Sequence, residues 1–227
     1  SEWTQKRFFI DIDDKLKTKT DVVYPSVNLK KKIGKKKNYI TFIGKLNESK
    51  GYDLFAKSIT KILDEFKTWK AFSLGDEDRR KIFIKHKNHF ELGFLKHSRV
   101  LELLDKTSIS VVPSKWEEPF GRTALEASSR GCATIISNRG GLPETTNHGV
   151  ILKNLDEVNL YKQIKYLIKN NNFRKKIQKN SFANVQHIIS ENTKIIDKIR
   201  QETLPLNNIN FIKKKLKILN IYNQGQK

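Results

Sequence analysis

The sequence is short of several residue types that mark particular classes of protein. It holds one cysteine, Cys132, and no methionine among 227 residues, which excludes a disulfide framework within the chain. Cys132 lies in an apolar stretch, so we predict a core residue and a reducing compartment. No apolar run reaches the length of a membrane-spanning helix, and no charged-then-apolar leader is seen. We therefore predict a cytoplasmic protein, and the start at Ser1 suggests a piece of a longer one.

The sequence patterns of common metal and nucleotide sites are also missing. The five histidines show no metal spacing, because His86 and His89 lie three apart without a cysteine or carboxylate companion. We interpret all five as surface residues and expect no metal site. No G-x-x-x-x-G-K-[ST], C-x-x-C or H-E-x-x-H occurs, which argues against a P-loop NTPase, a zinc ribbon and a metalloprotease.

The formal charge is strongly positive, at +21, and comes mainly from lysine. Such a charge would suit nucleic acid, an anionic membrane surface or a polyanionic small molecule. A composition rich in lysine, asparagine and isoleucine is explained equally well by an AT-rich genome. A nucleic-acid-binding protein would interleave aromatic residues with clustered arginines, whereas lysine greatly outnumbers arginine here. We therefore expect no specific nucleic-acid partner.

The chain is organised around one stretch, Pro113 to Gly131. The β-branched run Ile109–Pro113 predicts a buried strand of a parallel sheet. The polar loop SKWEEPFG follows, and Arg122–Arg130 is predicted to be a helix with a glycine cap. Glu118 therefore lies on the loop, and Glu126 lies two turns into the helix.

The start of that helix has a chemical use. The amides of Gly121, Arg122 and Thr123 have no partner within the helix, and this positive end of the helix dipole binds phosphate. Glu118 is suited to accept hydrogen bonds from sugar hydroxyls, and Glu126 could reach a second polyol such as a ribose. On the two glutamates alone, a surface loop and a helix with ordinary acidic residues is the favoured alternative.

The rest of the chain alternates between short apolar runs and helical periodicity, which predicts one α/β domain with a helical extension. Glycines that follow two of the runs permit close backbone approach to a ligand beyond the carboxyl ends of the strands. The predicted strands are Val22–Val27, which ends in a turn, Asn38–Ile43, Trp69–Leu74, Phe90–Leu92 and Ala133–Ser137. The predicted helices are Leu54–Phe66, Ser98–Lys106, one from Glu157, Phe173–Ile189 and Asn192–Ile199.

The segment Phe211–Ile221 interleaves apolar residues with lysines. A basic amphipathic helix on an anionic membrane is one interpretation. Packing against the chain's own domain or against a missing one is favoured, because the apolar stripe is short.

Four segments in this order, GKLNESKG, GFL, EPFGRTALE and NRGGLPE, resemble the motifs of the retaining glycosyltransferases of family 4. The resemblance runs from about Val22 to Ile199. It implies an α/β fold, a Rossmann-like parallel sheet flanked by helices that forms one half of a GT-B enzyme, with a C-terminal helical extension. It divides the chain into the end of a preceding domain or linker (1–21), the nucleotide-sugar-binding domain (22–203) and a basic tail (204–227).

The resemblance also implies roles for individual residues. Lys50 and Lys45, which stands where most members have arginine, would hold the diphosphate leaving group together with the helix amides. Glu118 would position the sugar and Glu126 the ribose, so that the implied catalytic residues are Glu118, Lys50 and Lys45. The other substrate-binding residues implied are Phe120, Gly121, Arg122, Thr123, Gly93, Phe94, Leu95 and Gly44. Gly140 and Gly141 would form a tight turn near the donor, and Glu144 is expected to be structural.

The implied activity is the transfer of a hexose, with retention, from a nucleoside-diphosphate sugar to an unknown glycan or lipid-linked acceptor in glycan or polysaccharide biosynthesis. Neither metal nor cofactor is expected. The chain would be inactive without its N-terminal acceptor domain and could touch the inner face of the membrane. Two alternatives remain: a nucleotide-sugar-binding module without catalysis, and a basic nucleic-acid-binding protein.

Overall fold

The computed structural model describes residues 1–13, 20–78 and 82–203. The chain divides into two compact units, Ser1–Ile188 and Ile189–Lys227. The first unit holds the sheet and every residue of the candidate site, and the described part of the second unit is the end of a long helix. The predicted amphipathic segment Phe211–Ile221 and the basic tail 204–227 lie outside the described residues.

Within the described residues, six strands form one sheet in which all neighbours are parallel, as predicted. The spatial order is β3-β2-β1-β4-β5-β6. The strands are β1 (Lys37–Ile43), β2 (Lys70–Leu74), β3 (His89–Glu91), β4 (Thr107–Val112), β5 (Ala133–Ser137) and β6 (Val150–Leu152).

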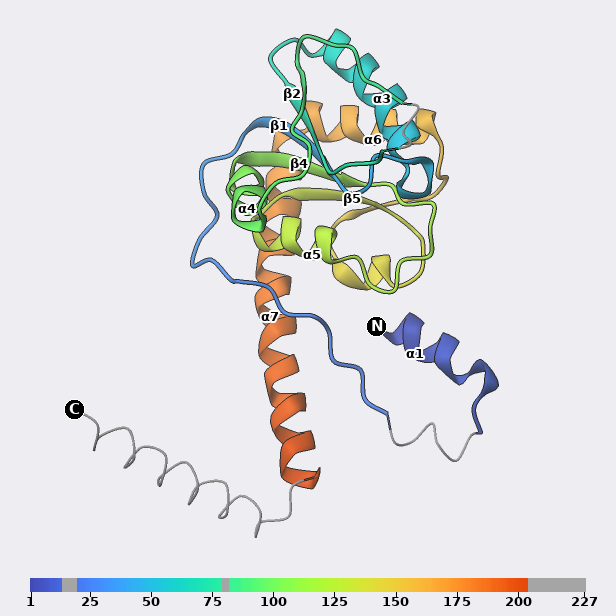
Figure 1. The fold of residues 1–227 in the computed structure, drawn as a ribbon. Coiled ribbons are helices and arrows are strands. Elements are labelled where there is room, and N and C mark those ends of the chain that lie inside the picture. The colour runs from blue at the N-terminus through green and yellow to red at the C-terminus, as the bar shows by residue number, and fades with distance from the viewer. Residues whose placement is uncertain (14–19, 79–81, 204–227) are drawn as a thin grey trace, which may run out of the picture. The chain divides into compact units, whose positions relative to one another are not determined.

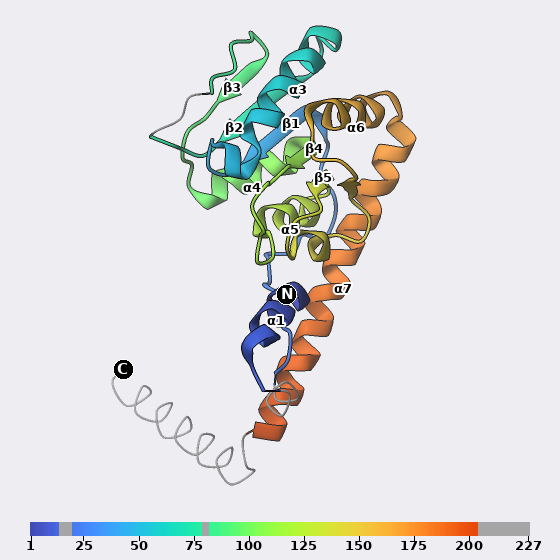
Figure 2. The same cartoon turned by 90° about the vertical axis from the view of Figure 1, so that its right-hand side faces the viewer.

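Helices cover both faces of this sheet, with α3 and α6 on one side and α4 and α5 on the other (Figure 1, Figure 2). The helices are α1 (Glu2–Phe8), α3 (Tyr52–Glu65), α4 (His97–Lys106), α5 (Arg122–Ser129), α6 (Glu157–Lys169) and α7 (Asn171–Thr203). The described part of the chain also holds three short 3-10 turns, η1 (Phe9–Asp11), η2 (Glu48–Lys50) and η3 (Leu142–Thr145). Among the described helices, none combines the length and the apolar content that crossing a bilayer requires.

The core explains why these segments form these elements. All six residues of β4 are buried, as expected for a central strand that is covered on both faces. Ile109 and Val111 pack with α3 and α6, whereas Val112 packs with the α5 side. Cys132 is fully buried, as predicted, and burial raises the pKa of its thiol to about 11.

Two predictions of secondary structure are wrong. Val22–Val27 forms no strand. The segment lies against the helices instead of the sheet: Tyr24 stacks on Phe120, and Val27 lines a cavity with residues of α4 and α5. The two predicted helices Phe173–Ile189 and Asn192–Ile199 are one continuous helix, α7, since the residues between them include neither proline nor glycine.

The strand order creates a particular place for a ligand. From β1 the chain moves outward to β2 and β3, then returns to β4 on the other side of β1 and continues outward to β5 and β6. The connections beyond the carboxyl ends of β1 and β4 therefore diverge. In open α/β sheets ligands bind in the crevice at this switch point.

Candidate functional site

A cavity of about 120 Å³ lies at the switch point, against the ends of β1 and β4. Its walls come from the end of β1, the loop with Lys50, the end of β4 and the first turn of α5. The lining residues are Phe42, Ile43, Gly44, Lys50, Val112, Ser114, Glu118, Gly121, Arg122 and Thr123. The fold thus brings together six of the predicted site residues in the walls, Gly44, Lys50, Glu118, Gly121, Arg122 and Thr123. Phe120 directly precedes Gly121 in the sequence but is not part of the walls.

Lys50 and Glu118 form an ion pair inside this cavity. Lys50 Nζ lies 2.6 Å from Glu118 Oε1, and the two side chains are 31% and 14% exposed. Lys50 ends the turn η2, whose start is fixed because the Asn47 side chain accepts the Lys50 amide at 3.2 Å. The next residue, Gly51, has φ 73°, and a Cβ there would lie 1.9 Å from the Pro113 carbonyl oxygen. Glycine is therefore required for the two loops to approach this closely.

The loop that carries Glu118 is fixed by the NRGG segment. The Gly141 amide donates to the Glu118 carbonyl at 2.7 Å, and the Gly140 amide donates to the Glu117 carboxylate at 2.5 Å. Gly140 has φ 58°, and a Cβ there would lie 2.2 Å from the Glu118 carbonyl oxygen. The predicted tight turn of Gly140 and Gly141 thus packs directly on the backbone of Glu118.

The first turn of α5 offers amide groups to the cavity. The amides of Ala124 and Leu125 make the first helical bonds, both to the Gly121 carbonyl, so the three amides of 121–123 precede the hydrogen-bonded turn. The side chain of Phe120 is 6% exposed and stacks on Tyr24 with ring centroids 5.3 Å apart. Phe120 therefore anchors the loop through its ring and leaves its backbone next to the cavity.

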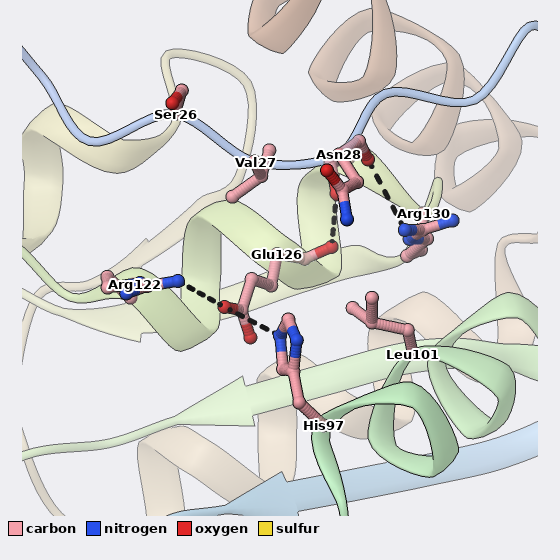
Figure 3. A pocket seen from close by; sticks show the side chains of 9 residues that line it. Ser26, Val27, Asn28, His97, Leu101, Arg122, Glu126 and Arg130 are labelled. Carbon is pink, nitrogen blue, oxygen red and sulfur yellow. Dashed lines mark hydrogen bonds and ion pairs between the residues drawn. The ribbon is translucent and has the colours of Figure 1, made fainter. Parts of the chain in front are cut away.

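A second cavity, of about 150 Å³, surrounds Glu126 (Figure 3). Glu126 lies one turn after Arg122, not two as predicted: α5 begins at Arg122 as expected, and four residues make about one helical turn. Its Oε1 accepts from Arg122 Nη2 at 3.4 Å and lies 3.1 Å from His97 Nε2. The side chain of Glu126 is 11% exposed. Arg122 lines both cavities, which therefore adjoin each other.

The sequence prediction missed the other walls of this second cavity. Ser26, Val27 and Asn28 cross above α5, and Arg130 donates to the Asn28 carbonyl at 3.3 Å (Figure 3). His97 is the first residue of α4 and directly follows the GFLK segment. Its place next to that motif could have marked it as a site residue.

Two other histidines do not fit the surface interpretation. The side chain of His86 is 10% exposed, and His89 is half-buried with its Nε2 2.8 Å from Ser73 Oγ. They lie on β3 and in the turn before it, and burial lowers the pKa of His89. The described residues include no group of three His, Cys, Asp or Glu side chains placed to hold one metal ion.

The remaining predicted residues lie outside both cavities. Lys45 follows Gly44, is exposed, and makes no ion pair with any residue that the structure describes. Gly93 has φ 61°, and its carbonyl accepts the Gly75 amide at 2.9 Å, which joins the ends of β2 and β3. Phe94 is 80% exposed, and Leu95 lines a separate groove.

Comparison with known proteins fits this geometry. The model of the family described as glycosyl transferases group 1 matches residues 27–183. The chain belongs to this family. It is 31% identical over 134 residues to an uncharacterised glycosyltransferase of Methanocaldococcus jannaschii, an alignment that covers 55% of this chain and 34% of that protein. It is also 34% identical over 106 residues to an uncharacterised 42.6 kDa protein in the cps region of Klebsiella pneumoniae, which covers 45% and 27%.

Solved structures, two of them of glycosyltransferases, share the fold. The C-terminal domain of the group 1 protein LpcC from Francisella tularensis has a TM-score of 0.60 at 24% identity, with 73% of this chain and 95% of that chain covered. A glycosyltransferase from Rickettsia africae has a TM-score of 0.69 at 19% identity, with 88% and 62% covered. Anabaena HepE in complex with UDP-glucose has a TM-score of 0.61 at 17% identity, with 73% and 49% covered.

The match to these glycosyltransferases shows the predicted Rossmann-like domain of the GT-B fold. The chain spans about a third of the length of the first curated relatives it matches. The group 1 domain therefore corresponds to one part of those proteins.

Proposed function

We propose that the chain is the donor-binding domain of a retaining glycosyltransferase of the family 4 type, and that the acceptor-binding half is mostly absent from it. The observation that carries this proposal is the cavity in which Lys50, Glu118 and the first turn of α5 meet at the switch point. A cation, helix amides and a carboxylate side by side match the diphosphate and the sugar of one nucleotide-sugar donor. The family membership and the UDP-glucose complex of the similar HepE support it.

In the proposed reaction the leaving group is a nucleoside diphosphate, on which negative charge develops. Lys50 and the amides of 121–123 would stabilise that charge, and Lys45 is close enough in sequence to the cavity to add a second cation. Glu118 would accept hydrogen bonds from sugar hydroxyls. Donor binding would then replace the Lys50–Glu118 pair by two new pairings, with the phosphate and with the sugar. No metal or cofactor is part of this proposal.

Glu126 would bind the ribose in the adjoining cavity, where Arg122 and His97 hold its carboxylate. Gly93, Phe94 and Leu95 would lie against the nucleobase, as the family resemblance implies. Pockets that enclose a small molecule usually measure about 300 Å³ or more, which exceeds the size of either cavity. We therefore expect the donor to span both cavities and to extend into space that the acceptor-binding half closes.

The wider setting belongs to the same proposal. The acceptor would be a glycan or a lipid-linked glycan in polysaccharide biosynthesis, and the whole enzyme would act in the cytoplasm or at the inner face of the membrane. Any binding of RNA or DNA by the scattered lysines would be non-specific and would vanish as salt rises.

Calorimetry tests the proposal directly. The chain is titrated with UDP, GDP and ADP, then with sugar nucleotides of whichever base binds, each in magnesium and in EDTA. We expect one diphosphate to bind, with an affinity that EDTA leaves unchanged. Failure of all three diphosphates to bind would refute the proposal.

Fusion of the chain to an acceptor-binding half separates the enzyme from its main alternative. Transfer of the sugar by the fused protein supports the glycosyltransferase. Binding of the donor without any transfer by the fused protein favours a binding module.

A further inference from the structure

The donor loop, here residues 118–120, is held at each residue by a different part of the chain. The Glu118 carbonyl accepts the Gly141 amide at 2.7 Å. The Pro119 carbonyl accepts the hydroxyl of Thr4 at 2.9 Å, and Ser1 Oγ donates to the same oxygen. The ring of Phe120 stacks on that of Tyr24. Two of these three supports therefore come from residues 1–24, which precede the family match at 27–183.

Glu144 joins these two supports. Its Oε2 accepts the Glu2 amide and its Oε1 accepts the Trp3 amide, each at 2.8 Å. Distances of this kind are typical of hydrogen bonds to a charged acceptor. The Tyr24 hydroxyl also hydrogen-bonds to Glu144, and burial together with this carboxylate raises the pKa of Tyr24 to about 12.

The carboxylate of Glu144 therefore points away from its own turn. Within η3 the Thr145 hydroxyl donates to the Leu142 carbonyl at 2.7 Å, and both residues are fully buried. Packing and that bond hold the turn, whereas both oxygens of Glu144 accept amides of α1. A glutamate with only a local structural role would not need these distant partners.

We propose that Glu144 is a positioning residue, which ties α1 and Tyr24 to the donor loop and thereby fixes Glu118 where the sugar of the donor binds. This inference rests on the proposed function for its effect on the ligand. One path runs from Glu144 through α1 to the Pro119 carbonyl, and the other runs through Tyr24 to the ring of Phe120.

This arrangement predicts a selective effect. Lys50 lies on η2, which is anchored by Asn47 rather than by α1. The amides of 121–123 open α5, which is held by the fully buried Ala124 and Leu125, so the diphosphate contacts should depend little on Glu144. Glu118 lies on the loop that α1 holds, so the sugar contact should depend on it. Loss of Glu144 should therefore weaken binding of the intact donor and spare the diphosphate.

The test uses Glu144→Ala in the full chain, with two measurements. Calorimetry with the diphosphate and with the matching sugar nucleotide should show about a three- to tenfold loss for the sugar nucleotide alone, the scale of reordering one or two groups. Hydrogen exchange should become faster in the peptides that cover 1–8 and 117–121. Glu144→Gln keeps one accepting oxygen of this kind and should recover part of the loss.

Two further variants sharpen the result. Thr4→Val removes the bond to Pro119 but leaves the Glu144 carboxylate and its bond to Tyr24 in place, so it should reproduce part of the selective loss. The double variant should be no worse than Glu144→Ala alone, because that variant already removes both paths. Glu157→Ala is the matched control, because the Glu157 carboxylate is also paired with a distant residue, Lys61, but lines neither cavity. Glu157→Ala should leave the affinity for both ligands unchanged.

Equal losses on both ligands, or unchanged exchange in 117–121 in Glu144→Ala, would overturn the inference. The exchange measurement needs no ligand. If the unmodified chain bound no nucleotide sugar, the proposed function would fail, while faster exchange in 117–121 would still support the tie between Glu144 and the loop.

Discussion

Replacement of Lys50 by alanine should weaken the binding of a nucleoside diphosphate, and the structure sets the scale of the loss. A hydrogen bond from a charged group contributes about 1.5–3 kcal/mol. In the unliganded chain Lys50 is already paired with Glu118 at 2.6 Å, and an ion pair near the surface contributes about 0.2–1 kcal/mol. Binding of the diphosphate replaces the Lys50–Glu118 ion pair by a pairing of Lys50 with phosphate. We therefore expect the lower end of the range, a loss of about 1.5 kcal/mol, or roughly tenfold in Kd.

Because Glu118 and the diphosphate compete for Lys50, the structure also predicts the sign of the coupling between substitutions at Lys50 and Glu118. In Glu118→Gln the carboxylate no longer competes for Lys50, so the diphosphate should bind at least as tightly as in the unmodified chain. Loss of Lys50 should then cost more in the Glu118→Gln background than in the unmodified chain. Calorimetry on the two single variants and the double variant measures this coupling directly.

Lys115 provides the matched control. It is paired with Asp53 at 2.7 Å and is 37% exposed, close to the 31% of Lys50, but it lines neither cavity. Lys115→Ala removes the same charge and should leave the Kd of the diphosphate within about twofold. A Kd that is unchanged in Lys50→Ala, or one that rises equally in both variants, would refute the placement of the diphosphate at Lys50.

Three other predictions follow from the described contacts. Glu126→Gln should weaken the binding of the diphosphate and of the intact donor alike, whereas Glu118→Gln should spare the diphosphate and lower the affinity for the intact donor by about 1–3 kcal/mol. The same pattern of losses in both variants, measured by calorimetry, would contradict the assigned roles. Gly140→Ala should lower the free energy of unfolding by about 1–3 kcal/mol in denaturant titration, because its Cβ would lie 2.2 Å from the Glu118 carbonyl; a stable variant would show that the loop can shift. Burial lowers the pKa of His89 below its ordinary 6.5, so the stability that neutral His89 contributes is fully present above pH 6.5 and is lost as the pH falls through the folded-state pKa. The melting temperature of His89→Gln should therefore fall less than that of the unmodified chain between neutral and mildly acidic pH. An equal fall in both proteins would show that protonation of His89 is not the cause.

The sheet could be predicted from the sequence because its strands are short, apolar and separated by helical periodicity. The predicted Ala133–Ser137 is the observed β5, and the strand predicted at Ile109–Pro113 is β4, shifted by two residues at its start. Val22–Val27 has the same apolar character but forms no strand, since pairing depends on an open sheet edge that lies far away in the sequence. Local pattern therefore identified candidate strands but could not tell which of them would find a partner.

The candidate site was predictable only to the level of loops. The motifs place Lys50 and Glu118 beyond two strands of the same sheet, and the fold indeed brings them together. Their direct ion pair could not be read from the sequence, because it depends on how closely Gly51 lets the two loops approach. The contacts of Glu126 with His97 and of Phe120 with Tyr24 join distant segments and needed the structure for the same reason.

The strand order also bears on how the chain is made. Ile40 of β1 pairs with Ala71 of β2 on one side and with Ile109 of β4 on the other. While the chain is being synthesised, β1 can pair with β2 early, but its other edge stays open until β4 has emerged. An apolar strand with a free edge is a template for association with other chains. Nascent chains that stall between β3 and β4 should therefore be the form most prone to aggregate and most in need of a chaperone.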